Sequence, residues 1–125
     1  MLGFGEARGF DLDPEAVRIA KENAVCNDLS NNVDFACADL SAGLESNCAD
    51  LLLANIETDV LCNHSLTLLT ALRPKGTLLL SGVLAKEIEQ VQNAFKGDAM
   101  KLSITISPSP CIDGEWISLG FTKDC

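Results

Sequence analysis

Short apolar runs alternate with amphipathic segments along this chain, and this alternation limits the possible folds more than any other feature of the sequence. The runs that have the length of a strand are residues 7–12, 33–38, 49–54 and 77–81. The segments with helical periodicity are residues 14–27, 58–72 and 85–95. Strands that alternate with helices are typical of a parallel sheet flanked by helices. The alternation therefore predicts an α/β fold.

The helix expected after the first strand has clear signals at its start. Asp13 has the side chain of a good N-cap, and Pro14 suits a first helical turn, where no backbone donor is needed. Val17, Ala20 and Ala24 then recur on one helical face. This segment is predicted to cover the sheet.

Two further segments define the predicted sheet. The run Ala49–Ala54 (ADLLLA) is apolar almost throughout, which predicts a central strand covered on both faces. Near the C-terminus, the strand-like runs 100–107 and 115–121 flank PSPCIDG with no room for a helix between them, which predicts an antiparallel hairpin. The expected architecture is a Rossmann-like, mostly parallel sheet that ends in this hairpin, with residues 1–125 as a single domain.

Length and charge exclude several classes of protein. A chain of 125 residues buries enough surface to fold without disulfides or metals. Its net charge of -9 works against binding a phosphate backbone, so nucleic acid is not expected as a partner. No apolar run reaches the roughly 20 residues that cross a bilayer, and the N-terminus lacks a signal-peptide layout. We therefore expect a cytoplasmic protein that does not bind membranes.

The cysteines predict reduced, buried thiols. They are Cys26, Cys37, Cys48, Cys62, Cys111 and Cys125. No two of them form a C-x-x-C pair, and the single imidazole, His64, has no second pair of ligands nearby, so no zinc site is expected. Cys62 and His64 are two residues apart, and such positions point to different faces of a helix, which argues against a nucleophile pair.

Several segments together resemble the catalytic domain of the ribosomal protein L11 methyltransferases, a group of class I enzymes that depend on S-adenosyl-L-methionine. In chain order these segments are GFDLDPEAV, AKENA, ANIETDVL, LRPKGTLLLSGVL and GEWISL. The resemblance runs from about Arg8 to Thr122. It implies transfer of a methyl group to protein amines, with ribosomal protein L11 as a possible substrate.

The resemblance also implies that part of the family fold lies outside this sequence. The family sheet has seven strands, and a Gly-rich loop after its central first strand holds the methionine part of the cofactor. No such strand and loop precede the acidic residue Asp11, so the chain is expected to be a fragment. Unpaired strand edges are then expected before Asp11 and Asn55, and such edges favour self-association.

Two carboxylates are candidates for cofactor binding. Asp11 ends the first strand, where ligands gather in open α/β sheets, and the resemblance implies that it accepts hydrogen bonds from the ribose hydroxyls. The alternative is a solvated acid or a second cap for the helix that begins at Pro14. Asp39 follows the second strand, where the family contacts the adenine amino group. The alternative for Asp39 is an acidic residue of a loop.

Asn55 is the candidate catalytic residue. It ends the most apolar strand, where a buried amide must find hydrogen-bond partners. The resemblance implies that its carbonyl, with the backbone carbonyl of Ile56, accepts from the incoming amine and also borders the cofactor. The alternative is a cap for the helix that starts near Thr58. Trp116 is a candidate for the acceptor pocket, with core packing as its alternative.

Two other functions remain open from the sequence. A non-catalytic remnant that acts at most as an interaction module explains the absent Gly-rich loop. A nicotinamide-dependent dehydrogenase explains Asp11 but neither Asn55 nor the terminal hairpin. No metal is expected in any of these three functions.

Overall fold

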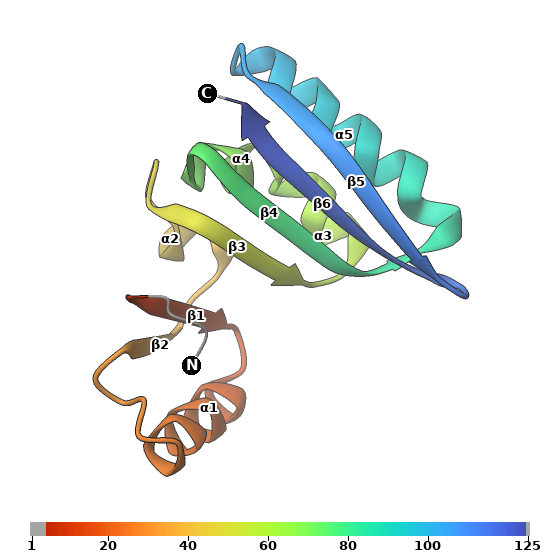
Figure 1. Cartoon of the computed structure of the whole chain (residues 1–125). Helices are drawn as coiled ribbons and strands as arrows, with labels where there is room; N and C mark the ends of the chain where they lie inside the picture. The colour runs from red at the N-terminus through yellow and green to blue at the C-terminus, as the bar shows by residue number, and fades with distance from the viewer. Residues whose placement is uncertain (1–4, 125) are drawn as a thin grey trace. The chain divides into compact units, whose positions relative to one another are not determined.

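The computed structural model describes residues 5–124 (Figure 1). The chain forms two compact units, residues 1–43 and residues 44–125, and each is described by itself. Within the described part, no helix is long and apolar enough to span a membrane.

The first unit is a strand–helix–strand unit that ends in one further helical turn. Its elements are β1 (Ala7–Asp11), α1 (Pro14–Cys26), β2 (Val33–Cys37) and α2 (Leu40–Gly43). The two strands are parallel, with Ala7 opposite Val33 and Asp11 opposite Cys37. The Asp13 carboxylate accepts the Glu15 N–H at 2.9 Å, which confirms the predicted N-cap of α1.

The second unit contains a four-stranded mixed sheet and three helices. Its elements are β3 (Ala49–Asn55), α3 (Thr58–Asn63), α4 (Ser65–Ala71), β4 (Leu72–Leu84), a 3-10 turn (Ala85–Glu87), α5 (Ile88–Lys101), β5 (Thr105–Asp113) and β6 (Trp116–Asp124). The strand order is β3-β4-β6-β5. β3 and β4 are parallel, whereas β6 is antiparallel to both β4 and β5. The predicted α/β fold and its C-terminal hairpin are confirmed.

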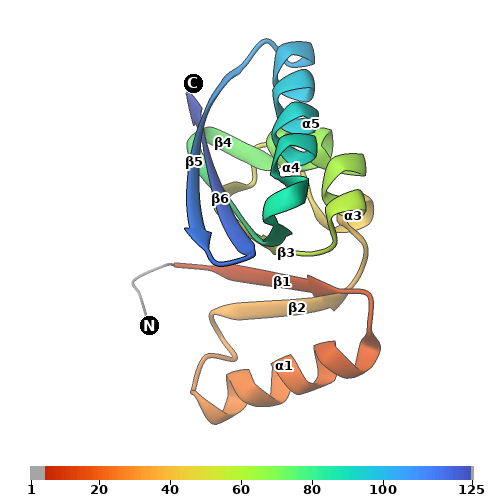
Figure 2. The ribbon, with the colours of Figure 1, turned by 90° about the vertical axis from the view of Figure 1, so that its right-hand side faces the viewer.

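The core of the second unit lies between one face of the sheet and the helices α3, α4 and α5 (Figure 2). Leu78, Leu80 and Val83 of β4 are fully buried on this face. The rings of Phe95 on α5 and Phe121 on β6 stack with their centroids 4.9 Å apart. Such a pair adds about 1 kcal/mol to the stability gained from burial alone.

The prediction that residues 49–54 form a central strand covered on both faces is wrong. Within its sheet β3 is an edge strand, and the side chain of Leu53 is 70% exposed. An apolar run indicates a preference for burial, but the order of strands depends on which segments pair. In this sheet β4 pairs with both β3 and β6 and therefore lies inside the sheet, where its Leu78 and Leu80 are fully buried.

The helix predicted over residues 58–72 is divided at His64. The backbone there leaves the helical region (φ -114°, ψ 12°), so α3 ends at Asn63 and α4 begins at Ser65. The hydroxyl of Ser65 is hydrogen-bonded to the Cys62 carbonyl at 3.0 Å and to the carboxylate of Asp98 on α5. A side chain 33 residues away thus stabilises the start of the second helix, which local periodicity does not reveal.

Other predicted boundaries also move. β4 begins at Leu72 rather than at residue 77, and it contains a bulge in which Lys75 has a φ of +66°. α5 continues through Gly97, and β5 includes most of the predicted loop PSPCIDG. Pro108 and Pro110 are accommodated because β5 is an edge strand, where a missing backbone donor is tolerated.

Lys123 connects the terminal strand to the end of α4. Its side chain is buried, and its amine donates to the carbonyl oxygens of Leu69 at 3.4 Å and Leu72 at 2.8 Å. Both carbonyls lie at the C-terminal end of α4, where unpaired carbonyls favour a positive charge. Lys123 is therefore a structural residue.

We expect Asp98→Ala to lower the free energy of unfolding by about 1–2 kcal/mol at neutral pH, since charge-assisted bonds of a shielded carboxylate are lost. The Ser65 hydroxyl, and then Lys101, hold the pKa of Asp98 below its ordinary value, and its side chain is 15% exposed. A depressed pKa stabilises the fold above the unfolded value of about 3.9, and this stability is lost as pH falls through the folded value.

Urea denaturation at pH 7 and pH 3 measures this effect. The matched control is Asp113→Ala on exposed β5. The difference in free energy of unfolding between Asp98→Ala and Asp113→Ala should be smaller at pH 3 than at pH 7. If both variants lost the same free energy of unfolding at pH 7, the assigned role of Asp98 would be contradicted.

Candidate functional site

Asp11 is the last residue of β1 and is exposed. Its Oδ1 accepts the Asp13 N–H at 2.9 Å, which fixes the turn into α1. An ionised carboxylate has about four acceptor positions, so this one bond leaves capacity for a ligand. The turn-forming role and the ribose-binding role are therefore compatible.

Asp39 begins the short helix α2. Its Oδ1 accepts the Ser41 hydroxyl and the Ala42 N–H, both at 2.8 Å. This is the geometry of an N-cap, so Asp39 has a local structural role besides the predicted contact with adenine.

Within the first unit, the parallel pairing of β1 and β2 brings these two carboxylates to the same end of the strands. Asp11 lies opposite Cys37, and Asp39 follows Cys37 by two residues. The Ala38 N–H donates to the Asp11 carbonyl at 3.1 Å, which continues the pairing to this point. Ligands of open α/β sheets bind at this end of the strands.

Asn55, the last residue of β3, lies opposite Ser81 in the second unit. It is exposed, so the prediction of a buried amide is wrong. The alternative role as a helix cap is also wrong, because Glu57 occupies the N-cap position of α3 without a side-chain bond. The Asn55 side chain is thus accessible at the carboxyl end of the strand.

Gly82 lies beneath the side chain of Asn55. It has a φ of +77° at the register shift between Leu80 and Val83. A Cβ atom built on Gly82 would lie 2.6 Å from Oδ1 of Asn55. The positive φ favours glycine here, and any Cβ at this position would require the Asn55 side chain to move.

Glu87, which the sequence analysis did not single out, positions the segment that follows Asn55. Its Oε2 accepts the buried Thr58 hydroxyl at 2.6 Å and the Leu84 N–H at 3.4 Å. These bonds join the start of α3 to the end of β4. No local pattern indicates a contact between residues 29 positions apart.

Trp116 lies on β6, opposite Leu84 and Asp113. Its side chain is 54% exposed, so the core-packing alternative is wrong. An exposed tryptophan offers a large apolar surface with one donor, which is common where proteins bind ligands.

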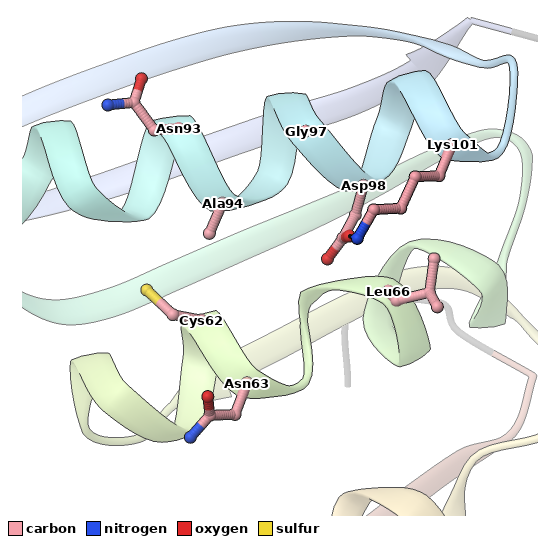
Figure 3. Close-up of a pocket in the computed structure, with 8 residues that line it drawn as sticks. All are labelled: Cys62, Asn63, Leu66, Asn93, Ala94, Gly97, Asp98 and Lys101. Atoms are coloured by element: carbon pink, nitrogen blue, oxygen red, sulfur yellow. Dashed lines mark hydrogen bonds and ion pairs between the residues drawn. The ribbon is translucent and has the colours of Figure 1, made fainter.

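A groove of about 490 Å³ lies between α5 and the α3–α4 pair (Figure 3). It is lined by Cys62, Asn63, Leu66, Asn93, Ala94, Gly97, Asp98 and Lys101. Burial, and then the nearby Asp59 carboxylate, raise the pKa of the Cys62 thiol. Because the thiolate is the reactive form, Cys62 is not an activated nucleophile.

The other cysteines add no metal site. Cys26, Cys37, Cys48 and Cys111 are free and exposed, so the prediction of buried thiols is wrong for these four. Cys125 lies outside the described residues. From Gly5 to Asp124, no three histidine, cysteine or acidic side chains are arranged to hold a metal ion.

Comparison with solved structures defines the fold class. A ribosomal protein L11 methylase from Lactobacillus delbrueckii subsp. bulgaricus superimposes with a TM-score of 0.83 and 23% identity, covering 99% of this chain and 61% of that one. An S-adenosylmethionine-dependent O-methyltransferase from Thermotoga maritima has a TM-score of 0.70 and 14% identity, covering 97% of this chain and 51% of that one. The fold is that of the class I methyltransferases.

Sequence comparison then identifies the family. The profile of the family "Ribosomal protein L11 methyltransferase (PrmA)" matches residues 1–124. The ribosomal protein L11 methyltransferase of Alteromonas mediterranea is 33% identical over 122 residues, which are 98% of this chain and 39% of the relative. That of Streptococcus equi subsp. zooepidemicus is 32% identical over 98% of this chain and 37% of the relative. The chain belongs to the ribosomal protein L11 methyltransferase family and spans less than half the length of these relatives.

We expect Gly82→Ala to destabilise the second unit by about 1–2 kcal/mol, because alanine is strained at a positive φ and its Cβ would also displace the Asn55 side chain. The matched control is Gly114→Ala, where φ is +62° but no atom lies within 4 Å of the new Cβ. Thermal unfolding of both variants isolates the clash. The double variant Asn55→Ala, Gly82→Ala should lose any stability difference between Gly82→Ala and Gly114→Ala that comes from the Asn55 side chain. If that difference persists, the close approach of Asn55 to residue 82 does not cause it.

Proposed function

We propose that this chain forms part of the cofactor-binding and acceptor-binding region of a methyltransferase that acts on protein amines. S-adenosylmethionine is the proposed cofactor, and ribosomal protein L11, after which the relatives are named, is the proposed substrate. The family match over residues 1–124 carries the proposal. The family match favours this function over the dehydrogenase alternative.

The reaction places modest demands on the protein. S-adenosylmethionine, when bound, supplies an electrophilic methyl group, and the acceptor must present a neutral amine in line with it. Positioning and desolvation then account for most of the catalysis, and neither a metal nor a strong base is needed. Side chains at strand ends suit this task because the sheet fixes their positions.

The first unit offers groups that suit a nucleoside. Asp11 retains acceptor positions for the two ribose hydroxyls, since only its Oδ1 is engaged in the turn with Asp13. Asp39 and the backbone beside it are proposed to lie against the adenine amino group. The side chains of Ala38 and Leu40 are proposed to border the adenine ring.

Asn55 is proposed to orient the acceptor amine. Its amide carbonyl, with the backbone carbonyl of Ile56, would accept hydrogen bonds from the amine and direct its lone pair. The absence of a Cβ at Gly82 leaves room for the Asn55 Oδ1 beside the backbone, which supports this role. Trp116 is proposed to flank the acceptor, given its exposed ring.

A segment exchange tests the proposed function. This chain would replace the matched segment of the Alteromonas mediterranea relative, and transfer of labelled methyl groups from S-adenosylmethionine to ribosomal protein L11 would be measured. We expect activity above that of the relative with the segment deleted. A folded chimera without activity would contradict the proposal.

In that chimera, Asn55→Ala should lower kcat at least roughly 100-fold with little change in cofactor affinity, because the contact is used mainly in the transition state. Asn63→Ala, which removes an exposed asparagine on α3, is the matched control. Steady-state kinetics and calorimetry separate the two effects. An equal loss of cofactor affinity would contradict the role of Asn55.

Asp11→Ala should instead weaken binding of S-adenosylmethionine by about 1–3 kcal/mol, the cost of losing charge-assisted bonds to the ribose. Calorimetric titration of the chimera measures this change. Asp34→Ala on β2 is the control, since it removes an exposed acid from the same unit. An unchanged dissociation constant for Asp11→Ala would leave Asp11 with its turn-forming role alone.

A further inference from the structure

Glu87 joins two segments of the second unit that are distant in the sequence. Its Oε2 atom accepts the Thr58 hydroxyl at 2.6 Å and the Leu84 N–H at 3.4 Å. Thr58 is three residues beyond Asn55 and only 7% exposed, so this bond is largely shielded from water. A shielded hydrogen bond to a carboxylate is stronger than one between neutral groups at the surface. Glu87 thus holds the start of α3 against the end of β4.

The start of α3 depends on this bond between distant residues. Glu57 occupies the N-cap position of α3, and its side chain forms no cap hydrogen bond. A capping side chain is the usual local restraint on the first turn of a helix. Because that restraint is not used here, the bond from Thr58 to Glu87 fixes how the chain passes from Asn55 through Ile56 into α3.

The turn that contains Glu87 is also bonded to the segment that carries Trp116. Ala85, two residues before Glu87, donates its N–H to the Glu115 carbonyl oxygen at 2.8 Å. Leu84, whose N–H donates to Glu87, lies opposite Trp116 in the pairing of β4 with β6. Glu87 is therefore connected to the segments of both residues that are proposed to contact the acceptor.

We propose that Glu87 is a positioning residue for methyl transfer, whose carboxylate sets the spacing between Asn55 and Trp116 and so determines how the acceptor amine is aligned. This inference rests on the proposed function, in which Asn55 orients the acceptor and Trp116 flanks it. Glu87 acts through Thr58 and Leu84 rather than by contact with the acceptor. All of these residues belong to the second unit, and contacts within that unit hold them together.

Loss of the carboxylate should affect the acceptor and not the cofactor. Without Glu87, the buried Thr58 hydroxyl loses its acceptor, and the first turn of α3 must shift to find another partner. A displacement of about 1 Å in a group that aligns reacting atoms can lower the rate by about 100-fold. The cofactor contacts are assigned to Asp11 and Asp39 in the first unit, so the affinity for S-adenosylmethionine should not change.

Steady-state kinetics of the chimera with the Alteromonas mediterranea relative test the proposal. Glu87→Ala should lower kcat at least roughly 10-fold and raise KM for ribosomal protein L11 at least roughly fivefold, because the acceptor is misaligned. Glu87→Gln should retain most of the activity, since its amide oxygen can still accept the Thr58 hydroxyl. The matched control, Glu89→Ala, removes an exposed carboxylate from the first turn of α5 and should leave both constants unchanged.

Thr58→Val tests the route through which Glu87 acts. This change removes the donor hydroxyl at nearly constant volume and should reproduce the defect of Glu87→Ala. The double variant should be no worse than Glu87→Ala alone, since both changes break the same hydrogen bond. Should Glu87→Ala not fold, the same measurements on Thr58→Val decide the question.

Calorimetric titration with S-adenosylmethionine separates positioning from a loss of folded protein. An unchanged stoichiometry and dissociation constant for Glu87→Ala, together with the raised KM, would support the positioning role. Wild-type kinetics for Glu87→Ala would overturn it, as would a fall in stoichiometry that matches the fall in kcat at constant KM. Additive losses in the double variant would also overturn it. A folded but inactive parent chimera would instead contradict the proposed function, and this inference with it.

Discussion

The pairing of β4 is the constraint on which the rest of the second unit depends. β4 is parallel to β3 on one side and antiparallel to β6 on the other. Its buried leucines and valine contribute to the core beneath α3, α4 and α5. The shift in register near its end places Gly82 under Asn55. A single strand therefore sets both the hydrophobic core and the location of the candidate catalytic side chain.

The candidate functional residues also serve the fold. Asp11 and Asp39 each accept backbone hydrogen bonds in turns, and these bonds fix their carboxylates at the strand ends. Asn55 does not cap a helix, and its exposed side chain lies where a Cβ on residue 82 would be. Because the local structure already determines where the two carboxylates lie, less conformational entropy is lost when they bind a ligand. This preorganisation supports the family function proposed for the chain.

The same sheet that positions Asn55 leaves β3 at its edge. An apolar strand at an edge satisfies only half of its backbone groups within its sheet, and its exposed leucines lie on the face without helices. The other edge strand, β5, contains Pro108 and Pro110, which lack the backbone donor that a further strand would need.

The sequence by itself determined the elements whose signals are local. They are the Asp13–Pro14 start of α1, the terminal hairpin and the apolar run of β3, which follow from capping, spacing and hydrophobic pattern. The tertiary structure decided the order of the strands and the exposure of Asn55 and Trp116. It also decided the contact of Asp98 at the point where α3 and α4 separate, and the role of Glu87. These features arise from contacts between residues distant in sequence, and periodicity and propensity describe only the preferences of each segment.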